Sequence, residues 1–355
     1  MYRRNIAEVI IVSSRPKFDS RKATPWDSKG ELTPMEAFLK QHHLAHYEER
    51  HRIVADSGEA EMINSFVPVK CPYCGRKPVF FKKSGHTASG VQRYKCTCGR
   101  TFLPTTGTIF DEHRISISEW MEYCQNLFRH VSLSADSWNN KNAITTSQYW
   151  LHKVFMTLEG VQDSIFLSGE VWLDETFYSV RKGDKTLHSD GKQLRGTSRN
   201  QYCIGVATDR KQTIFLVEGL GKPTQKKTWE TFKDHITPGS VLIHDGDSSH
   251  NRLVEALNLE SKVHLSKSTK GLPDKENPMY PVNHAHAILK HFLNSHGSFN
   301  RNDLQGYIDL FAFVTNPPKE LLEKTQILLK RVFENPKSLH YRDYFAAKSG
   351  LSEGD

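Results

Sequence analysis

The sequence has no apolar run long enough to cross a membrane, and the short run at residues 9–12 is too brief for the core of a signal peptide. It also has no internal repeat with a period of roughly 20–50 residues, which argues against solenoids and propellers. No single long basic tail is present, because the positive charge recurs along the chain. We therefore expect no membrane partner and a cytoplasmic location.

Cysteine is scarce, and its spacing does not suggest a disulfide framework. Four of the six cysteines fall within 28 positions, which favours a metal site in a reducing compartment. Each pair precedes a glycine, as in the tight turns of a zinc ribbon: Cys71, Cys74 and Gly75, then Cys96, Cys98 and Gly99. The second pair has one intervening residue where two are usual. Four unrelated buried thiols are the alternative; otherwise the sequence predicts a structural Zn²⁺ site with four thiolate ligands.

The charge balance is mildly basic. Lys and Arg exceed Asp and Glu by 48 to 40, which gives a formal net charge of +8 and an isoelectric point of about 9.0. Such an excess suits a polyanionic partner such as nucleic acid, but an ordinary enzyme can carry the same charge.

Changes in composition along the chain predict five segments. Near the start, residues 33–52 have helical periodicity, with Thr33 placed to cap the helix and Pro34 at its first position. The predicted segments are an N-terminal extension with one helix (1–65), a zinc ribbon with short β-like pieces at 78–81 and 93–95 (66–110), a helical region (111–162), a mixed α/β domain (163–320) and a helical tail (321–355).

The helical region contains two short helices around a turn rich in Ser and Thr, within residues 133–155, which is typical of a helix-turn-helix. Its second helix would enter the major groove of DNA. A helical hairpin that packs between domains is the alternative. The polar face available for reading DNA would be Ser147, Gln148, His152 and Lys153.

Residues after 165 change to strand patterns. The predicted strands are 165–167, 169–173, 202–208, 213–220 and 241–243, with a helix at 227–235 and further helices from 283 onward. A strand-rich block that is followed by helices indicates a mixed α/β domain.

Two of these strands are predicted to end in aspartate. Asp174 follows an apolar run and so does Asp245. A buried strand that ends in a carboxylate is costly unless the charge meets a cation or lies at a functional edge, although such residues also cap helices and form turns. Two carboxylates side by side would make a hard-oxygen site for Mg²⁺ or Mn²⁺.

A third polar group opens a later helix. Asn283 and Lys290 are seven residues apart, or two turns, and His286 lies between them on the same stripe. The stripe offers one oxygen or nitrogen ligand to a metal and one cation to a phosphate. An Asn cap followed by a solvated polar face is the alternative.

Taken together, these motifs resemble DDE-type insertion-sequence transposases with an N-terminal zinc ribbon, the group that carries an ISXO2-like transposase domain. The matching stretches run over roughly residues 65–316: CPYCG, RYKCTCGRTFLPTTGTIF, VWLDETFY, RGTSRNQYCIGVATDR, VLIHDGDSSH and VNHAHAILKHFLNSHGSFNRNDLQGYIDLFAFVTN. The resemblance implies a ribonuclease H-like catalytic domain and metal-dependent cleavage and transfer of DNA strands. Asp174 and Asp245 match the first two catalytic aspartates.

The third motif has no Glu, and members of this group carry Glu, Asn or His there, followed by Lys. The third ligand is therefore Asn283 or His286, and the seven-residue separation from Lys290 favours Asn283. A neutral ligand lowers the negative charge around the metals.

The resemblance leads to one main hypothesis and two alternatives. The main one is a transposase that binds the terminal inverted repeats of an insertion sequence and joins them to target DNA, with double-stranded DNA as partner, Mg²⁺ or Mn²⁺ at the catalytic residues and structural Zn²⁺. It would act as a homo-oligomer in a bacterial or archaeal cell, at the nucleoid when bound to DNA. A catalytically inactive DNA-binding derivative and a nuclease without joining activity are the alternatives.

Overall fold

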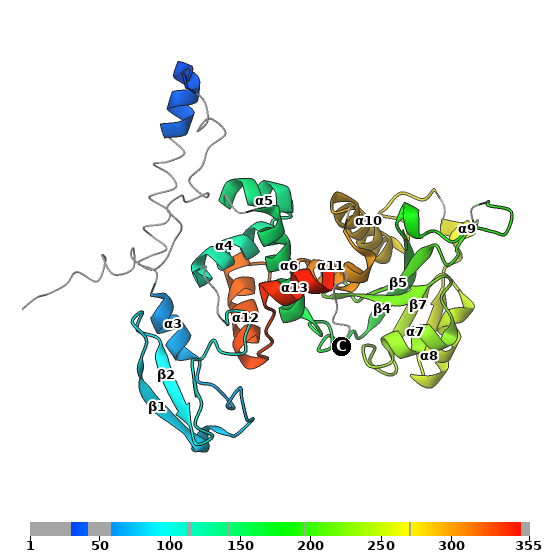
Figure 1. Ribbon diagram of the computed structural model, residues 1–355. Helices are drawn as coiled ribbons and strands as arrows, with labels where there is room; N and C mark the ends of the chain where they lie inside the picture. The colour runs from blue at the N-terminus through cyan, green and yellow to red at the C-terminus, as the bar shows by residue number, and fades with distance from the viewer. Residues whose placement is uncertain are drawn as a thin grey trace, which may run out of the picture. The chain divides into compact units, whose positions relative to one another are not determined.

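The computed structural model describes residues 30–41, 58–111, 116–140, 143–192, 194, 196–269, 271–297 and 299–348, with side chains at all of these except 138–140 and 346–348 (Figure 1). The chain divides into two compact units. Residues 1–157 together with 325–355 form the first unit, and residues 158–324 form the second. The five predicted segments remain a prediction at that level of detail.

The first unit begins with a helix over residues 34–41, whose start shows reciprocal capping. The backbone N–H of Glu36 donates to the Thr33 hydroxyl, and the Thr33 N–H donates to the Glu36 carboxylate. The predicted continuation to residue 52 lies outside the described residues. Helix α3 (Glu59–Ser65) follows, and then a three-stranded antiparallel sheet, β1-β2-β3 (Phe81–His86, Gln92–Cys96 and Thr101–Phe102). The predicted β-like piece at 78–81 is instead a 3-10 turn that leads into β1.

Among its described residues, the rest of the first unit consists of helices α4 (Ile117–Phe128), α5 (Leu133–Asn140), α6 (Ile144–Leu158), the greater part of α12 (Leu321–Glu334) and α13 (Tyr341–Lys348). The C-terminal segment returns to α6. The Tyr149 hydroxyl donates to the Leu339 carbonyl, and the rings of Tyr149 and Tyr341 lie 5.2 Å apart. The C-terminal tail is therefore part of the core of this unit.

This packing corrects the polar face predicted for α6. Ser147 is fully buried, and its hydroxyl donates to Asp136 of α5. Lys153 is also buried, and its ammonium donates to the Ile109 carbonyl and lies 4.7 Å from the Tyr149 ring. The prediction that these two side chains read DNA is wrong, because neighbouring elements cover α6 where they project.

The second unit contains a five-stranded mixed sheet in the order β6-β5-β4-β7-β8. The first three strands are antiparallel, and β7 and β8 run parallel to β4. The predicted fold class, a mixed sheet flanked by helices, is confirmed. The strands are β4 (Glu170–Ser179), β5 (Gln201–Thr208), β6 (Thr213–Leu220), β7 (Val241–His244) and β8 (Glu260–Val263).

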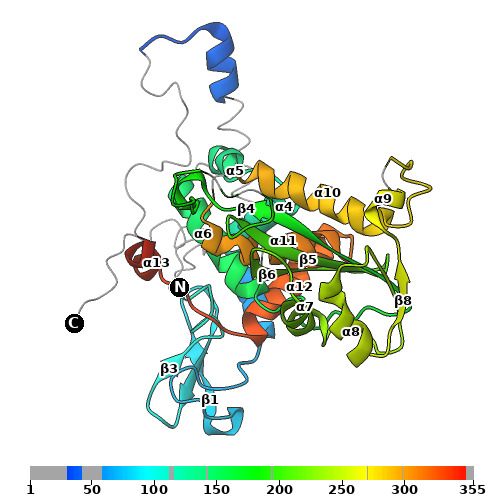
Figure 2. The same cartoon turned by 90° about the vertical axis from the view of Figure 1, so that its right-hand side faces the viewer.

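Helices cover both faces of this sheet (Figures 1 and 2). On one face, α7 (Gln225–Phe232) and α8 (Asn251–Ala256) bury an apolar cluster that includes Leu173 and Leu242. On the other face, α10 (Tyr280–Ser295) contacts β4 and β5, and α11 (Leu304–Thr315) contacts β6. Since side chains alternate along a strand, consecutive residues of β4 face different helices.

Three features of the sheet differ from the sequence prediction. Residues 165–167, predicted as a strand, contribute an isolated parallel bridge of Leu167 with Ile236 and no strand of the sheet. Strand β4 continues to Ser179, so Asp174 lies inside the strand and not at its end. The continuation is held by pairing with β5, which extends to Ser179, whereas the parallel pairing with β7 is recorded only to Trp172. Strand β8 was not predicted, because all four of its residues are exposed and its sequence is polar. Within the described residues, no helix is long and apolar enough to span a membrane.

Candidate metal centres

The first candidate centre lies where β4 passes the end of β7. These strands are parallel and their last recorded pair is Trp172 with Ile243, so Asp174 and Asp245 each come two residues after it. The two carboxyls are close enough for the charge of Asp245 to act on Asp174. Asp174 lies on the face that α10 covers, because side chains alternate along a strand and Trp172 and Asp174 are two residues apart. Asp245 directly follows the last residue of β7. The predicted metal site at these two carboxylates stays a prediction, and Asp174 lies inside a strand and not at its end.

Crowding perturbs the first of these carboxyls. Burial raises the pKa of Asp174 to about 7, and the charges of Asp245 and Glu175 add to this effect. The Asp174 Oδ1 accepts a hydrogen bond from the Glu175 N–H, which lowers the pKa by less. A carboxylate held among like charges in a partly buried site is the environment that a cation would stabilise.

Helix α10 contributes a histidine to the same place. His286 is buried, and its Nδ1 lies 4.0 Å from the Asp174 Oδ2. Burial lowers the pKa of His286 to about 4, with a further contribution from the charge of Lys290, so the ring is neutral at pH 7. Its Nε2 is buried and has no hydrogen-bond partner among the described residues. A neutral imidazole with a spare lone pair is a potential metal ligand.

The other two residues of the predicted stripe are placed differently. Asn283 and Lys290 are both exposed, while His286 points inward. No hydrogen bond of the Asn283 side chain is recorded in the described part of the chain, whereas its backbone N–H donates to the Met279 carbonyl. The structure therefore brings His286, and not Asn283, into contact with Asp174. Lys290 is close enough for its charge to act on His286.

The opposite face of the sheet carries a buried polar chain that was not predicted. The His250 Nε2 lies 3.0 Å from the Glu175 carboxylate, the Nδ1 atoms of His250 and His244 are 2.9 Å apart, and the His244 Nε2 is 2.9 Å from the Ser261 hydroxyl. His244, Asp245 and His250 each offer a ligand atom within 4.8 Å of the others. The sequence predicted no role for these histidines. The sequence signal for this cluster was the six-residue separation of His244 and His250, with Asp245 between them.

The raised pKa of Asp174 has a testable consequence for stability. The folded protein holds a proton that the unfolded chain releases at about pH 4, so stability is greatest below that pH and falls until about pH 7. In metal-free protein, Asp174→Asn should raise the free energy of unfolding at pH 8 by at most about 4 kcal/mol. The gain should shrink as the pH falls to 5. Urea unfolding at both pH values measures this, and an equal gain at both would contradict it.

The second candidate centre is the cysteine cluster. The Sγ atoms of Cys71 and Cys98 are 3.9 Å apart, and those of Cys74 and Cys96 are 3.7 Å apart. All four sulfurs lie within 4.8 Å of one another. Tetrahedral Zn²⁺ with bonds of about 2.3 Å needs sulfurs roughly 3.8 Å apart, so the cluster fits a zinc ribbon despite the short second turn. The Cys98 N–H, which favours the Cys96 thiolate, is the main reason that the pKa of Cys96 is lowered to about 7.

The comparison with protein families finds one matching domain, and the first centre lies within the matched residues. Residues 166–316 match the family model described as "ISXO2-like transposase domain". The chain carries an ISXO2-like transposase domain. The match includes Asp174, Asp245 and His286, and the transposase domain has a ribonuclease H-like fold, a mixed sheet flanked by helices. The cysteine cluster lies outside the matched residues.

No curated protein matches the sequence. Among solved structures, the transposase domain and its neighbours are similar to Mos1 transposase. The pre-cleavage Mos1 transpososome is 12% identical, with 65% of this chain and 83% of that chain covered and a TM-score of 0.20. The Mos1 catalytic domain with Raltegravir and Mg is 13% identical, with 64% and 100% covered and a TM-score of 0.23. Similarities at this level carry no conclusion about the chemistry of this chain.

Proposed function

We propose that this chain is a DNA transposase that binds the terminal inverted repeats of an insertion sequence and catalyses metal-dependent strand cleavage and strand transfer. The observation that carries the proposal is the proximity of Asp174 on β4 to Asp245, directly after the parallel neighbour β7, inside a domain that matches the ISXO2-like transposase model. Joining two DNA ends in one reaction also requires that the chain act as a homo-oligomer.

The residues of the acidic centre suit divalent cations. Asp174 and Asp245 supply carboxylate oxygens, which Mg²⁺ and Mn²⁺ prefer, and the unpartnered His286 Nε2 supplies one nitrogen. Bound metal would activate the attacking oxygen and stabilise the leaving oxygen of a phosphodiester. The protein itself fixes the two carboxylates through the sheet and the imidazole through α10. Lys290, exposed one turn further along, would hold a DNA phosphate.

The identity of the third ligand gives the first functional prediction. We expect His286→Ala to reduce metal-dependent cleavage by on the order of 10²-fold or more, because it removes a buried donor 4.0 Å from Asp174. Asn283→Ala should leave cleavage within about threefold of wild type, because its side chain is exposed. Gel analysis of a labelled terminal-repeat duplex in Mg²⁺ and in Mn²⁺ measures both.

Asn283→Ala is the matched control, since it removes an exposed polar side chain from the same helix three residues earlier. A nitrogen ligand suits Mn²⁺ better than Mg²⁺, so the wild-type protein should prefer Mn²⁺ and His286→Asp should shift the preference toward Mg²⁺. If Asn283→Ala lost activity and His286→Ala kept it, the third ligand would be Asn283.

The sheet of the zinc ribbon is suited to contact DNA. Along β2, buried and exposed residues alternate, so Tyr94 faces the core while Arg93 and Lys95 face outward. Lys95 pairs in register with Lys82 of β1, which is also exposed. The outer face of this sheet therefore carries several cations close together, which suits phosphate contacts.

A strand-transfer assay tests the whole proposal. The protein is mixed with a duplex of the repeats that flank its gene, a supercoiled target plasmid and Mg²⁺ or Mn²⁺, and joined products are sequenced. Joining with duplicated target sites supports a transposase. Specific binding of the repeats without cleavage would instead identify an inactive DNA-binding derivative, and cleavage without joining a nuclease.

A further inference from the structure

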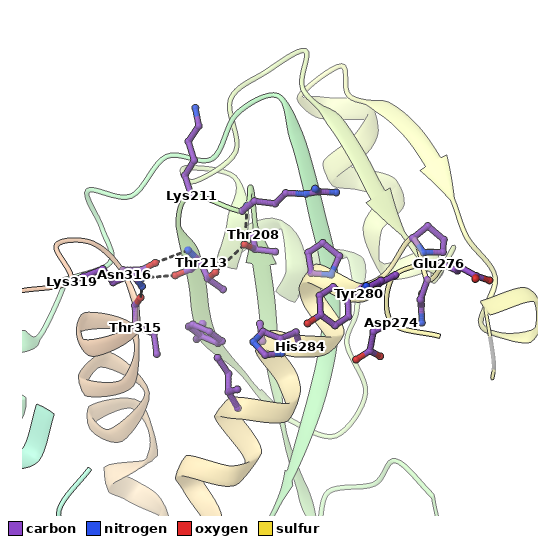
Figure 3. A pocket seen from close by; sticks show the side chains of 18 residues that line it. Thr208, Lys211, Thr213, Asp274, Glu276, Tyr280, His284, Thr315, Asn316 and Lys319 are labelled. Atoms are coloured by element: carbon purple, nitrogen blue, oxygen red, sulfur yellow. Dashed lines mark hydrogen bonds between the residues drawn. The ribbon is translucent and has the colours of Figure 1, made fainter. Parts of the chain in front are cut away.

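The second unit contains a cavity of about 580 Å³. Figure 3 shows the side chains that line it. It lies between the turn that joins β5 to β6, the C-terminal end of α11 and the N-terminal end of α10. Its volume is within the roughly 300–1,000 Å³ of pockets that bind small organic molecules. None of the residues assigned to the acidic centre lines it.

One wall of the cavity is held by side-chain hydrogen bonds. The Asn316 amide nitrogen donates to the Thr213 carbonyl at 2.7 Å, and the Thr213 N–H donates to the Asn316 amide oxygen at 2.7 Å. The Thr213 hydroxyl donates to the Thr208 hydroxyl at 2.9 Å. These bonds join the β5–β6 turn to the end of α11, so this wall is preformed.

Four cations line the cavity against two acids. The lining cations are Arg210, Lys211, Lys275 and Lys319, and the acids are Asp274 and Glu276. The Arg210 guanidinium lies 4.5 Å from the centre of the Trp172 ring, and the Lys319 ammonium donates to the Thr315 carbonyl at 2.6 Å. These contacts hold the Arg210 and Lys319 side chains in place. Both side chains retain N–H donors for an anion such as a phosphate.

The remaining lining offers flat, largely apolar surface. Tyr280 and His284, one turn apart on α10, have ring centres 5.5 Å apart, and both side chains are partly exposed. Pro278, Ile288 and the buried Phe215 complete this side. Nucleobases bind to such surfaces by stacking on aromatic rings, while neighbouring cations hold the phosphates.

Trp172 connects the cavity to the acidic centre. Its indole N–H donates a hydrogen bond to the Pro278 carbonyl, and the Arg210 guanidinium lies over its ring. Pro278 and Arg210 both line the cavity. Trp172 precedes Asp174 by two residues on the same face of β4, a separation of about 7 Å. A DNA strand with a phosphodiester at Asp174 would therefore have an adjoining nucleotide beside the cavity.

We propose that this cavity binds one unpaired nucleotide of the DNA strand adjoining the phosphodiester held at Asp174 and Asp245. The base stacks on Tyr280 and His284, and the phosphate contacts Arg210 and Lys319. The inference rests on the proposed transposase function, because it assumes DNA at the acidic centre. It adds a requirement that the DNA be unpaired next to the bond that is cut.

The test is a binding measurement without catalysis. Full-length protein is titrated, in EDTA, into a terminal-repeat duplex with one unpaired 2-aminopurine at its end, and into the same duplex with 2-aminopurine paired. We expect quenched fluorescence and tighter binding for the unpaired probe. Tyr280→Ala and Arg210→Ala should weaken binding of the unpaired probe by about 5- to 150-fold, and Tyr280→Ala should abolish the quenching.

Matched controls change one aromatic and one cationic residue outside the cavity. Phe166→Ala removes an exposed aromatic ring and Lys226→Ala removes an exposed cation on α7, and both should bind like wild type. Tyr280→Phe should retain the quenching, which separates stacking from damage to α10. The inference is overturned if Tyr280→Ala quenches like wild type, or if the variants weaken the paired and unpaired probes equally. Absence of strand transfer by a wild-type protein that still quenches would reject the proposed function alone.

Discussion

Replacing Asp174 with Asn should reduce metal-dependent DNA cleavage by on the order of 10³-fold or more, and Asp245→Asn should do the same. Each substitution removes one of two neighbouring negative charges that would hold the metal, and preorganised charge is usually the largest single contribution to such catalysis. Binding of the terminal repeats should change little, because the exposed cations of the zinc ribbon are untouched. Initial cleavage rates and gel-shift affinities, measured on the same protein, separate these effects.

Glu170→Gln is the matched control, because Glu170 is an exposed acid at the start of the same strand. It lies 3.9 Å from Lys262, a surface pair whose loss costs little. The Glu170 variant should therefore cleave like wild type. If Asp174→Asn kept more than about a tenth of the wild-type rate, Asp174 would not be a metal ligand in the reaction.

Loss of one thiolate should remove zinc and unfold the ribbon. We expect Cys74→Ser and Cys98→Ser to lower bound zinc from about one equivalent to almost none, since the closed site needs four thiolates. Structural zinc contributes on the order of 10 kcal/mol to small ribbons, more than three short strands can replace. Elemental analysis measures the zinc, and proteolysis between β1 and β2 reports the unfolding.

Ser84→Ala provides the comparison, because it changes a hydroxyl on β1 without touching a thiolate. This variant should keep its zinc and resist the protease. The second unit should be unaffected by the cysteine changes, so its own thermal transition is a further internal control. A Cys98→Ser protein that retained one zinc would show that the short Cys96–Cys98 turn supplies only one ligand.

Strong local patterns made most of the sheet predictable from sequence. Strands β5, β6 and β7 are apolar or β-branched over their length, and the structure places them within a residue or two of expectation. The sequence did not predict strand β8, because Glu260, Ser261 and Lys262 are polar and the strand lies at the edge of the sheet. The sequence did not predict the second half of β4 either, because pairing with β5 stabilises that segment and no local sequence pattern reveals this pairing.

The candidate site was predictable as a set of residue types but not in its detail. Periodicity placed Asn283, His286 and Lys290 on one stripe, but it could not say which of them faces β4. Packing decides this, because α10 turns Val282, His286 and Leu289 toward the sheet. The pair of Glu175 and His250 was missed for the same reason, since the two residues are distant in sequence and meet only across the buried face.

The division of the chain into units bears on how it folds during synthesis. The second unit is inserted into the first, because residues 325–348 return to pack against elements made much earlier. The Phe333 ring stacks on Phe66 at 4.1 Å, and Tyr341 meets Tyr149. During synthesis, the whole second unit is therefore made before the first unit receives most of α12 and all of α13. A nascent chain that stops near residue 324 would have the acidic centre but an unfinished helical unit, so the first unit completes its core only after the whole second unit has been synthesised.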